Sequence, residues 1–100
     1  MNNKQEMERQ IVEQFERDER MMILVFAQWC INHDLDPVEL YTRAYPQQAD
    51  NVELREALKI AVPKEEAGPI GEHIVLGMLA AYNNDELAAV VTEEIAKLKK

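Results

Sequence analysis

The sequence contains no serine and a single cysteine, Cys30. One cysteine cannot form a disulfide within the chain, which fits a reducing compartment and gives the expectation of a cytoplasmic protein. Cys30 also lies in the most apolar stretch of the chain, where a thiol tends to stay protonated and unreactive. We therefore expect no nucleophilic catalysis and assign no catalytic residue.

Glycine and proline are also scarce, with 3 and 4 copies in 100 residues, and threonine occurs only at Thr42 and Thr92. Few chain breakers and few β-branched polar residues favour helices over strands. Hydrophobic residues make up 47% of the chain, the usual level for a globular protein. A chain of this length typically forms one domain, so we expect a single all-α domain over residues 1–100.

No long hydrophobic run is present. The longest near-apolar run covers residues 21–31, is interrupted by Gln28, and is far shorter than the ~20 residues that a bilayer span needs. The N-terminal residues contain no apolar signal core. The sequence therefore predicts neither a membrane partner nor an export signal.

Positive charge is in the minority, with 11 basic against 19 acidic residues and a formal net charge of −8. An acidic surface repels a phosphate backbone. The predicted helices over 37–44 and 51–61 invite comparison with a helix-turn-helix, but the second offers DNA only Arg55 and Lys59. DNA binding is kept as a remote alternative, and no nucleic-acid partner is expected.

The first predicted helix runs from about residue 4 to residue 33, a stretch free of glycine and proline. Residues 21–31 are apolar on nearly all sides, which is typical of a helix buried at the centre of a domain. Thirty helical residues would extend about 45 Å, whereas a compact domain of this size is about 30 Å across. The helix therefore either breaks near residues 17–21, or its amphipathic half, residues 1–20, projects from the body.

A projecting half-helix would carry Met7, Ile11 and Phe15 along one side, at helical spacing. These side chains need a second surface to cover them, and another copy of the same chain is the simplest source. We therefore name Met7, Ile11 and Phe15 as candidate interaction residues of a homodimer.

Four further helices complete the predicted bundle of about five. Asp36, Pro37 and Glu39 form the start signal of a short helix over 37–44, ended by Pro46. A second D-x-x-E signal, from Asp50, predicts a short helix over 51–61. Two C-terminal helices are expected over 70–82 and 85–98, with Gly77 marking a close approach of another backbone. The expected core residues are Leu24, Phe26, Trp29, Ile74, Leu79, Val91 and Ile95.

One cluster resembles a set of metal ligands: Cys30 and His33 share a helix face at i,i+3, and Asp34 and Asp36 follow. Zinc requires three or four such ligands, and no second Cys–His pair is present. A buried cysteine, a histidine at a helix end and two turn-forming aspartates explain the same residues. We assign no metal and no cofactor.

The segment 64–73 concentrates carboxylates, a lysine and a histidine around glycines and prolines. Such groups could transfer protons in a pocket, and a glycine-flanked helix start could hold an anion. A solvated connection and a peptide-binding loop are the other interpretations. The candidate ligand residues are Lys64, Glu65, Glu66, Gly68, Gly71, Glu72 and His73.

Tyr41, Arg43 and Tyr45 place two aromatic rings and a guanidinium beside a turn, and these residue types are frequent interface anchors. They are also common as half-buried residues that close a small core. Together with the long first helix, they predict a non-enzymatic adaptor or regulatory domain that contacts another protein, as a homodimer. A ligand-binding or catalytic domain centred on 64–73 is the alternative.

Overall fold

The computed structural model describes residues 19–48 and 51–99, and it contains no strand within these ranges. A helix over residues 19–32, called the central helix below, is followed by four α-helices and one short 3₁₀ helix. These are α2 (Pro37–Ala44), η1 (Pro46–Gln48), α3 (Val52–Ile60), α4 (Glu72–Ala81) and α5 (Asp85–Leu98). The prediction of an all-α bundle is confirmed.

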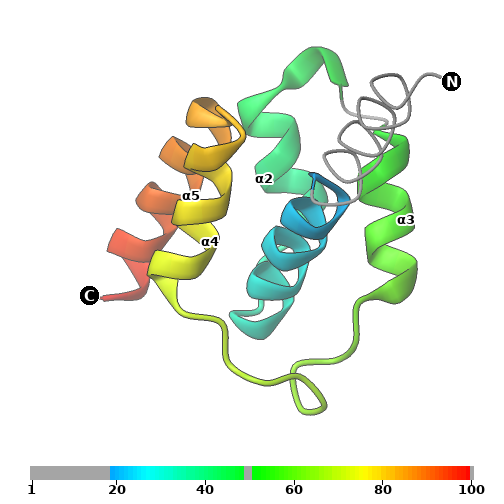
Figure 1. Ribbon diagram of the computed structural model, residues 1–100. Coiled ribbons are helices and arrows are strands. Elements are labelled where there is room, and N and C mark those ends of the chain that lie inside the picture. The colour runs from blue at the N-terminus through cyan, green and yellow to red at the C-terminus, as the bar shows by residue number, and fades with distance from the viewer. Residues whose placement is uncertain (1–18, 49–50, 100) are drawn as a thin grey trace, which may run out of the picture.

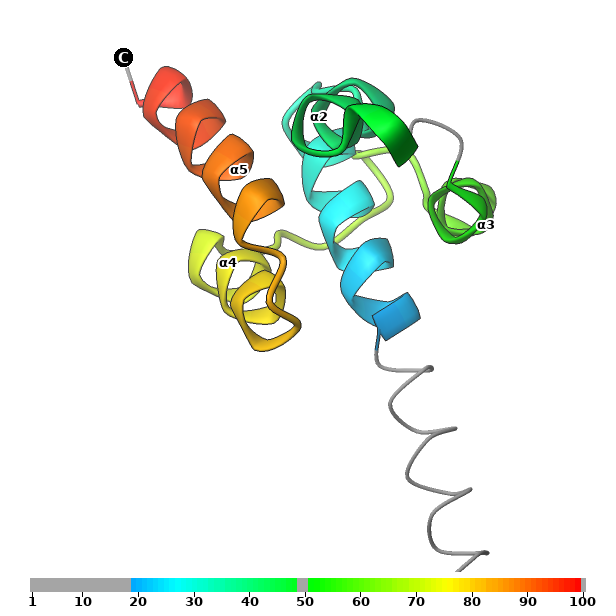
Figure 2. The same cartoon turned by 90° about the horizontal axis from the view of Figure 1, so that it is seen from above.

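The central helix lies in the middle of the bundle (Figures 1 and 2). The hairpin of α4 and α5 packs on one side of it, α3 lies on the opposite side, and α2 lies above it in Figure 1. The connection from α3 to α4 passes along the lower edge in that view. Helix α5 packs against both α2 and α4, and α3 lies on the far side of the central helix from this hairpin.

The core forms around the apolar residues of the central helix, as predicted for the run 21–31. Its buried residues on that helix are Met22, Ile23, Phe26, Ala27, Trp29 and Cys30. Of the other expected core residues, Leu79, Val91 and Ile95 are buried. Leu24 is only half-buried.

The prediction that Ile74 is a core residue is wrong, because this residue is 46% exposed. On α4, Val75 and Leu79 are four residues apart and form the buried stripe. Because residues 74–76 are all apolar, the sequence does not indicate which side of α4 faces the core. The packing of α4 against α5 determines that side.

Local signals fix the helix boundaries. The Asp36 carboxylate accepts hydrogen bonds from the backbone N–H groups of Val38 (2.9 Å) and Glu39 (3.4 Å), and α2 and α5 have the predicted bounds. The N-cap of α3 is Asn51, whose side chain accepts from the Leu54 N–H at 2.9 Å, rather than the Asp50 of the predicted signal. Asp50 itself lies outside the described residues. Helix α4 begins at Glu72, later than predicted.

Two helices end on a residue with left-handed backbone, Asp34 (φ 59°) and Asn83 (φ 58°). In each case the following residue donates its N–H to a carbonyl five residues back: Leu35 to Cys30 and Asn84 to Leu79, both at 2.8 Å. This is the Schellman arrangement, and Asn and Asp tolerate the left-handed region better than most residues.

Three further expectations concern Gly77, membrane-spanning helices and the N-terminal half-helix. No atom of the described residues lies within 4 Å of the position that a Cβ of Gly77 would occupy, apart from its own helix backbone, so the expected close approach is wrong. Among the helices in the described ranges, none is long and apolar enough to cross a bilayer. The amphipathic half-helix with Met7, Ile11 and Phe15 lies outside the described residues.

Candidate interaction site

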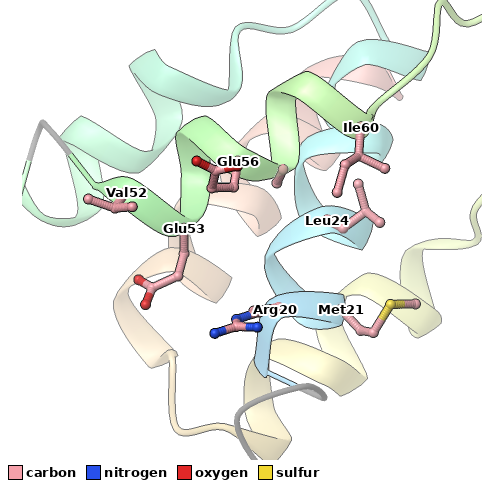
Figure 3. A pocket seen from close by; sticks show the side chains of 8 residues that line it. Arg20, Met21, Leu24, Val52, Glu53, Glu56 and Ile60 are labelled. Atoms are coloured by element: carbon pink, nitrogen blue, oxygen red, sulfur yellow. The ribbon is translucent and has the colours of Figure 1, made fainter.

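A groove of about 520 Å³ separates the central helix from α3. Figure 3 shows the side chains around it, with Leu24 and Ile60 pointing toward each other. The groove exists because α3 buries only Leu54 and Ala57. The lining residues are Arg20, Met21, Leu24, Val52, Glu53, Glu56, Ala57 and Ile60.

The apolar groups of the groove are unusually open to solvent. Ile60 is 65% exposed, Val52 58% and Met21 48%, and these are among the most exposed large hydrophobic side chains in the described part of the chain. Scattered single apolar residues are normal on protein surfaces, but a grouped set in a concave feature marks a binding site. The grouping of Met21, Val52 and Ile60 around one groove is therefore the feature most suggestive of function.

Charged side chains border this apolar surface. Arg20 lies on the central helix, and Glu53 and Glu56 lie on α3 (Figure 3). Lys59, which the DNA-binding alternative requires, is 3.5 Å from Glu56 in an i,i+3 ion pair. The rim thus carries both signs of charge, and α3 does not offer the basic field that is typical of a recognition helix.

A second, more polar cavity of about 200 Å³ lies at the same end of the central helix and shares Glu53 with the groove. The Tyr41 and Tyr45 rings meet here with centroids 5.2 Å apart. The Tyr45 hydroxyl donates to the side-chain oxygen of Asn84 at 2.7 Å, and the Asn51 amide donates to the Tyr41 hydroxyl at 3.0 Å. Burial raises the pKa of both tyrosines, so both stay protonated and able to donate.

Arg43 does not join the two tyrosines. Its guanidinium contacts α5 instead, with Nη1 2.9 Å from Oε1 of Glu94 and Nη2 3.3 Å from Oε2 of Glu93. The hydrogen bond from Arg43 lowers the pKa of Glu94, whose side chain is only 9% exposed. Arg43 therefore links α2 to α5, while Tyr41 and Tyr45 line the cavity on the other side of α2.

Hydrogen bonds and an ion pair hold the connection over 61–71 against the central helix and the turn that follows it. The Gln28 amide donates to the Val62 carbonyl at 2.9 Å and accepts from the Val62 N–H at 3.0 Å, which reproduces the pairing of a neighbouring strand. Asn32 donates to the Gly68 carbonyl at 3.2 Å, and Lys64 Nζ is 2.7 Å from an Asp34 oxygen. These contacts hold a long loop without secondary structure of its own.

The candidate ligand residues of 64–73, which lie on this connection and at the start of α4, are all exposed, and their side chains have different neighbours. Lys64 pairs with Asp34, Glu72 lies 3.4 Å from Lys99, and the His73 ring lies against Gly71. Neither of the two cavities described above is lined by any residue of 64–73. Within the described ranges, these groups do not converge as a proton-transfer site requires.

The residues of the possible metal cluster also diverge. Cys30 is fully buried, and burial raises the pKa of its thiol to about 12, with a smaller contribution from Asp36. His33 is exposed and its ring lies 4.8 Å from that of Trp29. The Asp36 carboxylate accepts the capping hydrogen bonds of α2. In the described ranges no group of three or more such side chains is placed to hold a metal ion.

Sequence reasoning missed the four large apolar residues of the groove as site residues: Met21, Leu24, Val52 and Ile60. A signal was present in α3, because Val52 and Ile60 stand apart from the buried pair Leu54 and Ala57. Two apolar faces on so short a helix leave one of them uncovered by the bundle.

Comparison with known proteins places this architecture in a family. The family model described as YxiS matches residues 3–96. The chain belongs to the YxiS family. Over 94 residues it is 50% identical to the Bacillus subtilis (strain 168) protein described as "Uncharacterized protein YxiS", a match that covers 93% of this chain and 98% of that relative. No solved structure matches the chain. The YxiS match includes the central helix, α3 and the groove between them.

Proposed function

We propose that this member of the YxiS family is a non-enzymatic, cytoplasmic protein–protein interaction domain, and that it assembles as a homodimer through the groove between the central helix and α3. The observation that carries the proposal is the grouping of Met21, Val52 and Ile60, all largely exposed, around a concave apolar surface. Covering these side chains removes apolar area from water, which contributes about 25 cal/mol per Å².

The surroundings support contact rather than chemistry. The titratable residues that border the groove are Arg20, Glu53 and Glu56, and no histidine or cysteine lines it. The buried thiol of Cys30 is kept protonated and lies in the core instead. An apolar centre with a mixed-charge rim is the usual anatomy of a protein interface.

Charge introduction at the groove tests this function. Ile60→Lys should convert the dimer to a monomer, because a lysine at the centre of an interface would have to be desolvated without a partner. Ile60 is 65% exposed, so the monomer fold should tolerate the change. Ile74→Lys is the matched control, since Ile74 is 46% exposed on α4 and does not line the groove.

Sedimentation velocity of the full chain and both variants supplies the measurement. The proposal requires a dimer for the unchanged chain and for Ile74→Lys, and a monomer for Ile60→Lys. Identical masses for all three proteins would show that the groove is not the assembly surface.

A further inference from the structure

Resting on the proposed function, we propose that the groove of one chain is filled by residues 4–18 of a second chain, so that two chains exchange N-terminal segments reciprocally. The groove is concave and apolar, so two grooves placed face to face would leave a void between them. A helix that carries one apolar stripe is the convex shape that fills such a surface.

The N-terminal segment carries a stripe of this kind. Met7, Ile11 and Phe15 recur every four residues, a spacing that aligns their side chains on one face of a helix. The positions between them are mostly charged or amide residues, which can face solvent. The segment therefore offers the groove an apolar face and needs a partner for it.

The N-terminal segment joins the bundle next to residues that line the groove, which favours the groove as its binding site. The described chain starts at Glu19 within a helix, and the next two residues, Arg20 and Met21, already line the groove. Eighteen residues precede Glu19. They correspond to about 27 Å if helical, ample to cross a neighbouring α3 of nine residues.

The segment that fills the groove comes more readily from a second chain than from the same chain. To reach its own groove, the segment would have to reverse direction just before Glu19. The first proline of the sequence is Pro37 and the first glycine is Gly68, so neither of the two strongest helix-breaking residue types is available there. Reciprocal exchange needs no reversal and closes as a two-fold dimer, in which each contact occurs twice.

The charges on the two surfaces are compatible with this arrangement. The segment carries three basic residues, Lys4, Arg9 and Arg17, for the two glutamates that border the groove on α3, and five acidic residues that face either Arg20 or solvent. Opposite charges at the rim of an interface orient the partners and increase the association rate.

Site-specific photo-crosslinking tests the exchange. Glu56, at the rim, is replaced by p-benzoylphenylalanine in the full chain, and equal amounts of ¹⁴N-labelled and ¹⁵N-labelled protein are mixed, refolded together and irradiated. We expect crosslinked peptides that join residue 56 of one isotope to residues 4–18 of the other. Crosslinks to 4–18 within one isotope alone would overturn the exchange in favour of self-binding.

The other outcomes separate this inference from the proposed function. Crosslinks from residue 56 to a different segment of the second chain would overturn the exchange and leave a groove-mediated dimer. A monomeric mass with no crosslink between chains would overturn both. A bound apolar small molecule in the groove, seen as added mass on a monomer, would also overturn both.

A pair of double variants gives an independent check. Ile11→Lys with Phe15→Lys places two charges on the stripe and should reduce the dimer to a monomer at micromolar concentration. Gln5→Lys with Gln10→Lys adds the same charge away from the stripe and should leave the dimer intact. Equal dimer fractions for the two double variants would contradict the exchange.

Discussion

A polar residue at a helix terminus can make tertiary contacts in place of a capping hydrogen bond, as Asn84 does. Asn84 occupies the N-cap position of α5, yet its side chain makes no capping hydrogen bond. It accepts from the Tyr45 hydroxyl at 2.7 Å and contacts the Met22 sulfur at 3.0 Å through its amide. Asn is a frequent N-cap residue, but here the packing of three helices determines what its side chain does.

Gly77 provides a prediction at the residue scale. It lies inside α4 with open space at its Cβ position, so Gly77→Ala should increase the free energy of unfolding by about 0.5–1 kcal/mol through helix propensity. For a domain of this size that corresponds to a rise in Tm of roughly 2–8 °C. Thermal unfolding followed by circular dichroism measures it.

A decrease in Tm for Gly77→Ala would contradict the free space seen at this position. If that decrease came with a loss of dimer mass, α4 rather than the groove would be the surface that another chain approaches.

Among the connections between elements, the long loop from α3 to α4 is held in part by the pairing of Gln28 with Val62. Gln28→Met removes a donor and an acceptor while keeping the side-chain length. We expect the Val62 amide to exchange its hydrogen much faster, and the free energy of unfolding to fall by about 1–2 kcal/mol for three lost hydrogen bonds, two to Val62 and one to the Asn32 side chain.

Hydrogen exchange followed by NMR gives the rate for Val62, with Gln47→Met on exposed η1 as the control. Unchanged protection of the Val62 amide in Gln28→Met would show that the loop is held by its other contacts, those of Asn32 and Lys64.

The link between α2 and α5 depends on pH. Arg43 holds the pKa of Glu94 below its ordinary value of about 4.3. The folded state then binds a proton less readily than the unfolded state, so this pair stabilises the fold above that pH and loses its effect as the pH falls through the lower, folded value. Arg43→Ala should cost about 1–2 kcal/mol at pH 7, because Glu94 is left mostly buried, and less at pH 3.5.

Urea unfolding of the unchanged chain and of Arg43→Ala at the two pH values measures this difference. Glu93→Gln, which removes the exposed partner of Arg43, should cost less than about 0.5 kcal/mol. An Arg43→Ala penalty that is the same at both pH values would assign the effect to packing of the arginine stem.

Across the elements, the sequence predicted most accurately where a local signal is unambiguous. The Asp36-Pro37 start and the stop at Pro46 gave the bounds of α2, and the predicted range 85–98 matches α5. Helix α4 was less well placed, because its apolar residues surround most of the helix and its N-cap is a glycine without a side-chain acceptor.

For the whole molecule, the burial of most of the apolar run 21–31 at the centre of a helical bundle follows from the sequence, whereas the exposure of Met21 and the groove beside it do not. Its volume depends on how far α3 stands from the central helix, and that distance is set by the three-dimensional packing of Leu54 and Ala57. Tyr41 and Tyr45 are close in sequence and in space, but Arg43 between them faces α5 because helix geometry turns alternate residues away from each other.

Native mass spectrometry of the untagged full chain tests the central claim most directly, because it reports subunit number and bound ligand together. The account predicts a species of twice the chain mass with nothing added, reduced to a single chain by Ile60→Lys. A monomer that carries a metal ion or a small molecule would contradict it.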